Sequence, residues 1–169
     1  GWGRLVRSLR LMELSGEVVS GRFFSGVRGL QFASHRGVRM LQQPLPGGMC
    51  WMSAADPASL CGVRIDGLDW GLPRRVPGTH VVYQDRRPVL ISRRRGEDLE
   101  LRVEPEDPLA GSCLFLFREL TERKVRPLRS VRVLRINGEP APASPYAARL
   151  LEFGFTKGYR HLIMRGSYR

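Results

Sequence analysis

The stretch that decides the N-terminal fold is residues 17–32, which read E-V-V-S-G-R-F-F-S-G-V-R-G-L-Q-F. Two short β-prone runs flank a loop rich in glycine and arginine, which is the pattern of a β-hairpin. Residues 2–15 precede this stretch, and their apolar side chains Leu5, Leu9 and Met12 have helical spacing. The sequence therefore predicts a helix that leads directly into a hairpin.

A helix followed by a hairpin forms the second half of a winged-helix domain. The predicted hairpin tip carries Arg22 and Arg28, which suit contact with phosphates, and its glycines allow close approach of the backbone. On the helix, Arg4, Arg7 and Arg10 lie three residues apart along a neighbouring face. These arginines are candidate nucleic-acid-binding residues. The alternative is a plain αββ unit whose arginines are only solvated.

The charge of the chain favours a polyanionic partner. The 169 residues include 28 Lys and Arg against 16 Asp and Glu, which gives a net charge of +12. Residues 1–43 carry seven basic and two acidic side chains, residues 44–105 nine and eight, and residues 106–169 twelve and six. A surplus of this size favours nucleic acid, because binding releases the counterions condensed on its phosphates. Charge alone does not distinguish DNA from RNA.

Beyond the turn cluster at residues 44–48 the chain consists of short strands separated by turns, which is typical of a barrel or sandwich. After a further helix at 35–42, we expect strands at 49–54, 80–84, 88–92, 99–103, 131–136 and 159–165, and helices at 111–122 and 144–152. The expected fold class is α+β. Residues 1–43 form the C-terminal half of a winged helix, and residues 44–169 form a mostly antiparallel β-barrel-like domain with helical insertions.

Two further loops are candidate nucleic-acid contacts. Trp70 lies in a glycine-rich loop beside Arg74 and Arg75, and an aromatic side chain next to paired arginines is an arrangement that strand-binding loops use. Arg93, Arg94 and Arg95 form the densest basic cluster, at an expected turn. Phosphate contact and a solvated hairpin tip are equally good interpretations of that cluster.

The sequence predicts no catalytic residue, metal site or cofactor in this chain. The phosphate-binding pattern G-x-x-x-x-G-K-[ST] does not occur, and the three cysteines form no C-x-x-C pair. The histidines lack both metal-ligand spacing and a nucleophile partner. No apolar run is long enough to span a membrane, and we expect a cytoplasmic protein.

Four motifs occur in an order that resembles large helicase-related (Lhr) proteins. They are R-L-M-E-L-S-G-E-V-V-S-G-R-F-F with G-L-Q-F-A at residues 10–33, S-A-A-D-P-A-S-L-C-G at 53–62, the hairpin at 75–91, and N-G-E-P with S-P and E-F-G-F at 137–155. The resemblance implies the end of a winged helix followed by a β-barrel-like domain, in a longer protein. In that family these regions lie downstream of two ATPase domains that translocate on single-stranded DNA, so ATP and Mg²⁺ are implied for the parent helicase.

The function expected from this resemblance is that of a DNA-binding accessory module of an ATP-dependent helicase in DNA repair. Its partners are single-stranded or forked DNA, with RNA as an alternative, and the upstream domains of the parent chain. Two other functions stay open. One is part of an AlkZ-like DNA glycosylase domain, since the C-terminal region of long family members is similar to those enzymes. The other is a structural or oligomerisation domain.

Overall fold

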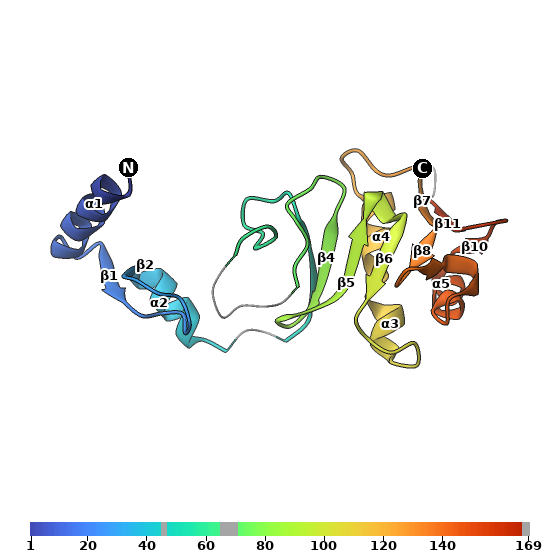
Figure 1. The fold of residues 1–169 in the computed structure, drawn as a ribbon, viewed down its shortest axis with the longest axis horizontal. Helices are drawn as coiled ribbons and strands as arrows, with labels where there is room; N and C mark the ends of the chain where they lie inside the picture. Colours follow the sequence, from blue (N-terminus) through green and yellow to red (C-terminus); the bar gives the residue numbers. More distant parts are fainter. Residues whose placement is uncertain (45–46, 65–70, 167–169) are drawn as a thin grey trace. The chain divides into compact units, whose positions relative to one another are not determined.

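The computed structural model describes residues 1–44, 47–64 and 71–166. The chain divides into two compact units, residues 1–46 with 64–69 and residues 47–63 with 70–169. Figure 1 shows the elements of each unit as a ribbon. Within the described ranges, no helix is long and apolar enough to cross a membrane.

The first unit contains two helices and a hairpin. Its elements are α1 (Trp2–Leu14), β1 (Val18–Gly21), β2 (Gln31–Ser34) and α2 (His35–Gln42). The strands are antiparallel, with Val18 opposite Ser34 and Gly21 opposite Gln31. The hydroxyl of Ser34 accepts the N–H of Gly37 at 3.1 Å and caps α2. The predicted helix, hairpin and second helix are all confirmed.

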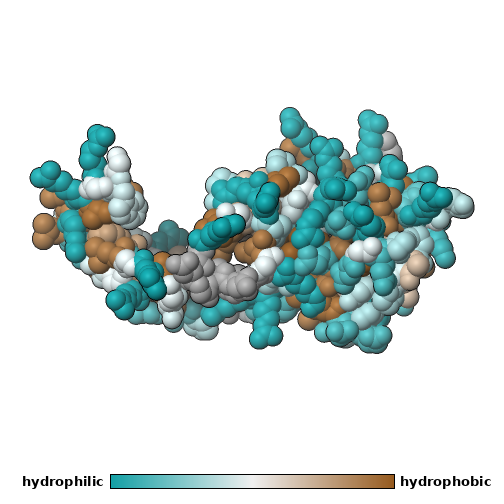
Figure 2. All heavy atoms as spheres, viewed as in Figure 1, coloured by the Kyte–Doolittle hydropathy of each residue, from teal (hydrophilic) through white to brown (hydrophobic). Residues whose placement is uncertain are grey.

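Polar contacts connect the elements of the first unit. Glu13 of α1 pairs with Arg10 and accepts a hydrogen bond from the hydroxyl of Ser20 on β1. The ring nitrogen Nε2 of His35 lies 2.9 Å from the carbonyl oxygen of Gly16, which joins the end of α1 to the start of α2. Among the described apolar side chains of this unit, Val18 is the only buried one. Figure 2 shows apolar side chains open to solvent over this unit, at the left of the view.

The second unit contains two sheets. A six-stranded sheet has the order β3 (Met49–Ser53), β4 (His80–Gln84), β5 (Arg87–Arg93), β6 (Asp98–Leu101), β8 (Arg135–Ile136), β9 (Glu139–Pro140). Its pairs are antiparallel except β6 with β8. A three-stranded antiparallel sheet has the order β10 (Thr156–Lys157), β11 (Leu162–Arg165), β7 (Ser130–Val133). Over the described residues neither sheet closes on itself, so the expected barrel is wrong.

The strand expected at 131–136 is broken into β7 and β8, which belong to different sheets. The carbonyl of Glu97 accepts the N–H of both Leu134 and Arg135, at 2.9 and 3.1 Å. The chain leaves β7 at this point and enters β8 in the other sheet. One run of residues therefore supplies a strand to each of two sheets.

The helices of the second unit also differ from the expected bounds. The helix expected at 111–122 is two helices, α3 (Pro108–Ser112) and α4 (Phe115–Glu122). Asp107 caps α3 by accepting the N–H of Leu109 at 2.8 Å, and Pro108 occupies the first turn. The helix expected at 144–152 is α5 (Ala147–Phe153), which ends at Gly154 with φ of +116°. Two 3₁₀ turns, η1 (Arg94–Gly96) and η2 (Ala141–Ala143), complete the elements.

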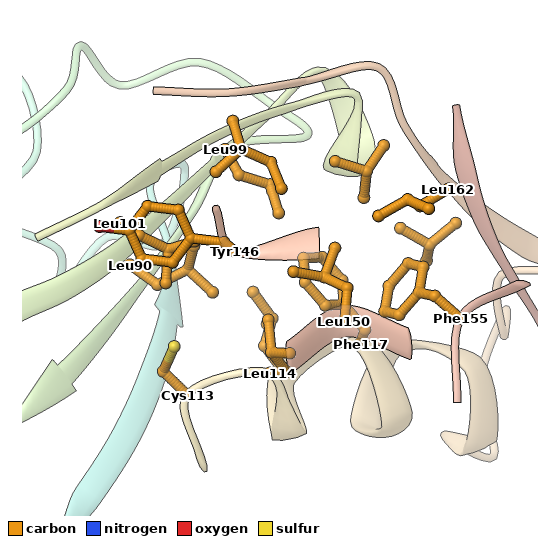
Figure 3. Packing of buried hydrophobic residues seen from close by; sticks show 14 of the residues in the cluster. Leu90, Leu99, Leu101, Cys113, Leu114, Phe117, Tyr146, Leu150, Phe155 and Leu162 are labelled. Carbon is orange, nitrogen blue, oxygen red and sulfur yellow. The ribbon is translucent and has the colours of Figure 1, made fainter. Parts of the chain in front are cut away.

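One hydrophobic core joins both sheets and the three helices (Figure 3). Phe117 of α4 and Phe155 meet edge to face with ring centroids 5.6 Å apart. The hydroxyl of Tyr146 donates to the carbonyl of Val103 at 2.7 Å. A smaller buried cluster consists of Ala54, Cys61, Val81 and Ile91. The second unit therefore has the packed interior that the first unit lacks.

Gly96 is required where η1 passes over this core. Its φ is +102°, and a Cβ there would overlap Cγ1 of Val131. We expect Gly96→Ala to lower the free energy of unfolding by about 2–4 kcal/mol, because left-handed backbone strain adds to overpacking. The control is Gly138→Ala, at φ of +87° with no atom within 4 Å of the added Cβ, which should cost about 1 kcal/mol. Equal losses in urea denaturation would contradict the packing argument.

His80 and Ser92 are buried opposite each other on β4 and β5. Within the described chain, His80 Nδ1 and Ser92 Oγ have no hydrogen-bond partner. The ring of His80 meets Trp51 edge to face at 5.6 Å. Burial first, and the nearby Arg123 guanidinium second, lower the pKa of His80.

The lowered pKa predicts how stability depends on pH. In the unfolded chain His80 has a pKa of about 6.5, whereas in the folded chain its pKa is lower. As the pH falls below 6.5, the unfolded chain binds a proton that the folded chain does not. The free energy of unfolding therefore decreases until the pH reaches the pKa of the folded chain. We expect the urea concentration at the unfolding midpoint to decrease as the pH is lowered from 7.5 to 5. His80→Asn should remove part of this dependence. An identical pH profile in the variant would exclude His80 as its source.

Candidate nucleic-acid interface

The β1–β2 loop, residues 22–30, is organised by the side chain of Gln31. Its Oε1 accepts the N–H groups of Phe23 and Phe24 at 2.8 and 2.9 Å. Its Nε2 donates to the carbonyls of Phe24 and Val27 at 3.3 and 3.1 Å. One amide at the start of β2 therefore fixes both sides of the loop.

This loop presents two guanidinium groups and an aromatic ring to solvent. Arg22 and Arg28 are exposed, and neither has a carboxylate partner within the described chain. Phe24 lies between them in the sequence and is 58% exposed. Residues 22–29 line a concavity of about 770 Å³. Cations beside an exposed aromatic ring are what surfaces that bind single strands use, because phosphates and base faces are both available there.

The three candidate arginines of α1 are not equivalent. Arg4 and Arg7 are exposed and have no acidic partner among the described residues. Arg10 pairs with Glu13, and its guanidinium carbon lies 5.8 Å from the centroid of the Phe32 ring. The hydrogen bond from Ser20, followed by the one from Arg10, lowers the pKa of Glu13. Arg10 thus already fastens α1 to the hairpin, whereas Arg4 and Arg7 are open to a ligand.

The candidates in the 70–75 loop also differ in whether they are free to bind a ligand. Trp70 lies outside the described residues. Arg74 is exposed. Arg75 donates to the carbonyls of Ser59 and Cys61 at 2.6 and 3.4 Å, so its guanidinium already fastens the 59–61 turn.

The Arg93–Arg95 cluster is split by the end of β5. Arg93 pairs with Glu100 at 2.6 Å. Burial acts to raise the pKa of Glu100, but hydrogen bonds from Arg93 and Arg102 outweigh it, and the pKa is lowered. Arg94 and Arg95 are exposed at positive φ, and the N–H of Arg95 donates to Gly78 at 2.8 Å. Arg94 and Arg95 therefore remain open to solvent, and Arg93 does not.

Residues 1–48 match the family model described as "Large helicase-related protein, winged-helix domain". These residues, which contain α1, β1, β2 and α2, are similar to the winged-helix domain of large helicase-related proteins. Comparison with curated proteins finds no match to the chain. The resemblance to large helicase-related proteins is confirmed over the matched residues. For the motifs at 53–62, 75–91 and 137–155 it stays a prediction.

In this winged-helix domain the β1–β2 loop is the wing, and the sequence had pointed to its arginines. Sequence reasoning missed Phe24 and Gln31. The pattern G-R-F-F with G-L-Q-F-A contains both residues. A polar residue at the start of a strand, directly after a glycine-rich loop, is the signal that would have identified Gln31, because loop amides without a backbone partner need another acceptor.

Within the described ranges no group of side chains is arranged for metal binding or nucleophilic catalysis. No group of three His, Cys, Asp or Glu side chains there is placed to hold a metal ion. Cys113 is buried, and burial raises its thiol pKa to about 12, so it stays protonated and unreactive. The site is therefore one of cations, an aromatic ring and backbone amides.

Replacing Gln31 tests the organisation of the wing. In Gln31→Ala the amides of Phe23 and Phe24 lose their acceptor, and we expect their hydrogen-exchange protection to fall about tenfold. Gln31→Glu keeps the acceptor and loses the donor, so these two amides should stay protected while the carbonyls of Phe24 and Val27 are released. Unchanged protection in Gln31→Ala would show that the loop is held in another way.

Proposed function

We propose that this chain is a nucleic-acid-binding accessory module of an ATP-dependent large helicase-related helicase that acts in DNA repair. The observation that carries the proposal is the β1–β2 loop of the winged-helix domain. Gln31 fixes this loop, and it presents Arg22, Arg28 and Phe24 to solvent without an acidic partner among the described residues.

The chemistry of the loop favours a ligand with phosphates and unpaired bases. Guanidinium groups contact phosphates whatever the sequence, whereas the face of Phe24 can stack only on a base that is not paired. Single-stranded or forked DNA fits both features, and RNA offers the same groups. Arg4 and Arg7 on α1 add cations to the same unit. Binding should therefore depend on salt and only weakly on sequence.

In this proposal the chain positions the strand and other parts of the parent protein supply the motor. The sequence holds no phosphate-binding loop, so ATP and Mg²⁺ belong to the proposed ATPase domains of the parent. The setting we propose is cytoplasmic. Within the described residues no feature favours the glycosylase or oligomerisation alternatives over strand binding.

The proposal predicts a salt-dependent loss of affinity in Arg22→Ala/Arg28→Ala. Fluorescence anisotropy with a labelled single strand and a labelled fork measures it. We expect about tenfold weaker binding at moderate salt. The slope of log K against log salt should be flatter by about 1.4 for the single strand, because two phosphate contacts are lost.

The matched control is Arg22→Lys/Arg28→Lys, which keeps both charges and should bind within about twofold of the wild type if the contacts are to phosphates. Binding by the wild type that does not change between low and moderate salt would overturn the proposal. An assay of the parent protein for abasic product on uracil-containing DNA decides the glycosylase alternative.

A further inference from the structure

The outer face of the three-stranded sheet carries arginine where a core-facing strand would carry aliphatic side chains. Arg132 of β7 lies opposite Ile163 of β11, and Arg165 of β11 lies opposite Ser130 of β7. Directly paired residues share a face, and side chains alternate along each strand. Val131, Val133, Leu162 and Met164 therefore point into the core, where they are buried, and Arg132 and Arg165 point outward, where they are exposed.

The segments that build this sheet contain cations and no carboxylates. Residues 123–138 and 154–166 include no Asp or Glu. The exposed cations of these segments are Arg123, Lys124, Arg126, Arg129, Arg132, Arg135, Lys157, Arg160 and Arg165. Among these described residues only Arg135 has a carboxylate within 4 Å, Asp98 at 3.8 Å. The sheet therefore has an uncompensated positive surface.

An aromatic side chain lies in the hairpin turn at one end of this surface. The turn is closed by the N–H of Gly158, which donates to the carbonyl of His161 at 2.8 Å. Tyr159 is 91% exposed, and the Arg160 guanidinium carbon lies 5.5 Å from the centroid of its ring. The turn is tight, because a Cβ at Gly158 would lie 2.7 Å from Nε2 of His161 and would displace that ring. The ring of Tyr159 is thus held in solvent with a cation beside it.

We propose that the outer face of the β10–β11–β7 sheet is a second binding surface for single-stranded nucleic acid, with Tyr159 stacking on an unpaired base. Arg132 and Arg165 contact phosphates of the same strand. The hairpin lies at the side of the second unit farthest from β4 (Figure 1).

Three observations favour a single strand over other polyanions. The face of Tyr159 can stack only on an unpaired base. The extended strand β11, Leu162–Arg165, spans on the order of 10 Å, which matches about three stacked nucleotides at 3.4 Å each, and Tyr159 lies in the turn before it. A membrane surface would call for apolar side chains that enter it, whereas the outward residues at the paired positions are Arg132, Arg165, Ser130, Thr156 and the half-buried Ile163.

This inference rests on the proposed function, because it assigns the same class of ligand to a different unit. The experiment therefore uses the full chain, once with the wild-type β1–β2 loop and once with Arg22→Ala/Arg28→Ala. The probe is a 12-nucleotide single strand that contains 2-aminopurine, made both as DNA and as RNA. Stacking quenches 2-aminopurine, so its fluorescence reports contact with a ring, and anisotropy reports the affinity.

We expect Tyr159→Ala to weaken binding about tenfold in both backgrounds and to reduce the quenching, with the remainder due to Phe24. Tyr159→Phe keeps the ring and should behave as the wild type. Arg132→Ala/Arg165→Ala should flatten the salt slope by about 1.4, and Arg132→Lys/Arg165→Lys should restore it. Because Tyr159 is so exposed, its variants should keep the wild-type melting temperature, which separates lost contact from lost fold.

Two results would overturn the inference in different ways. If Tyr159→Ala and Arg132→Ala/Arg165→Ala bind and quench as the wild type does, while Arg22→Ala/Arg28→Ala has lost affinity, this surface is not used and the proposed function stands. If the wild type binds no oligonucleotide, both this inference and the proposed function are wrong. Binding to phosphatidylserine vesicles that excess oligonucleotide does not displace would also overturn it, in favour of a membrane.

Discussion

The arrangement of the second unit depends on the carbonyl of Glu97, which accepts the amides of Leu134 and Arg135 together. This shared acceptor ends β7 and starts β8 within a few residues, and β8 then pairs with β6 in parallel. Because the chain changes sheets here, the side chains on either side of the break point into one interior. Val131 and Val133 enter the core from one sheet and Ile136 enters it from the other. Side chains alternate along β7 up to the break, so Arg132 points outward between Val131 and Val133.

Local patterns predicted the individual elements well, since each depends on residues close in the sequence. The hairpin at residues 80–93 and the helix at 35–42 follow from strand alternation and helical spacing. Closure of a barrel depends on which strand edges meet, and that is set by contacts such as Glu97 with Leu134, far apart in the sequence. The helix expected at 111–122 failed for a local reason. Asp107 and Pro108 form a helix-start signal that places a separate short helix before α4.

The candidate site shows why arginines are hard to assign from sequence. Arg10, Arg75 and Arg93 are engaged by a carboxylate or by carbonyls that fold brings near, whereas Arg22 and Arg28 are not. The partner of Arg10 is visible in the neighbouring sequence, at Glu13, but that of Arg75 is not, because it lies 16 residues away at Ser59. A guanidinium that already holds internal partners gives up those hydrogen bonds to meet a phosphate, so its net contribution to binding is small.

Each unit has a turn that is ordered by hydrogen bonds and exposes an aromatic ring, although the two turns differ in sequence. In one, Gln31 fixes a loop that exposes Phe24; in the other, the closed turn at Gly158 exposes Tyr159. In each case hydrogen bonds order the backbone before a ligand arrives, which reduces the entropy lost on binding. The central strands contribute less to the positive electrostatic potential of the chain, because Asp98 and Glu100 there pair with neighbouring arginines. The two proposed surfaces therefore share an ordered turn with an exposed ring, and each would depend on salt through its own arginines.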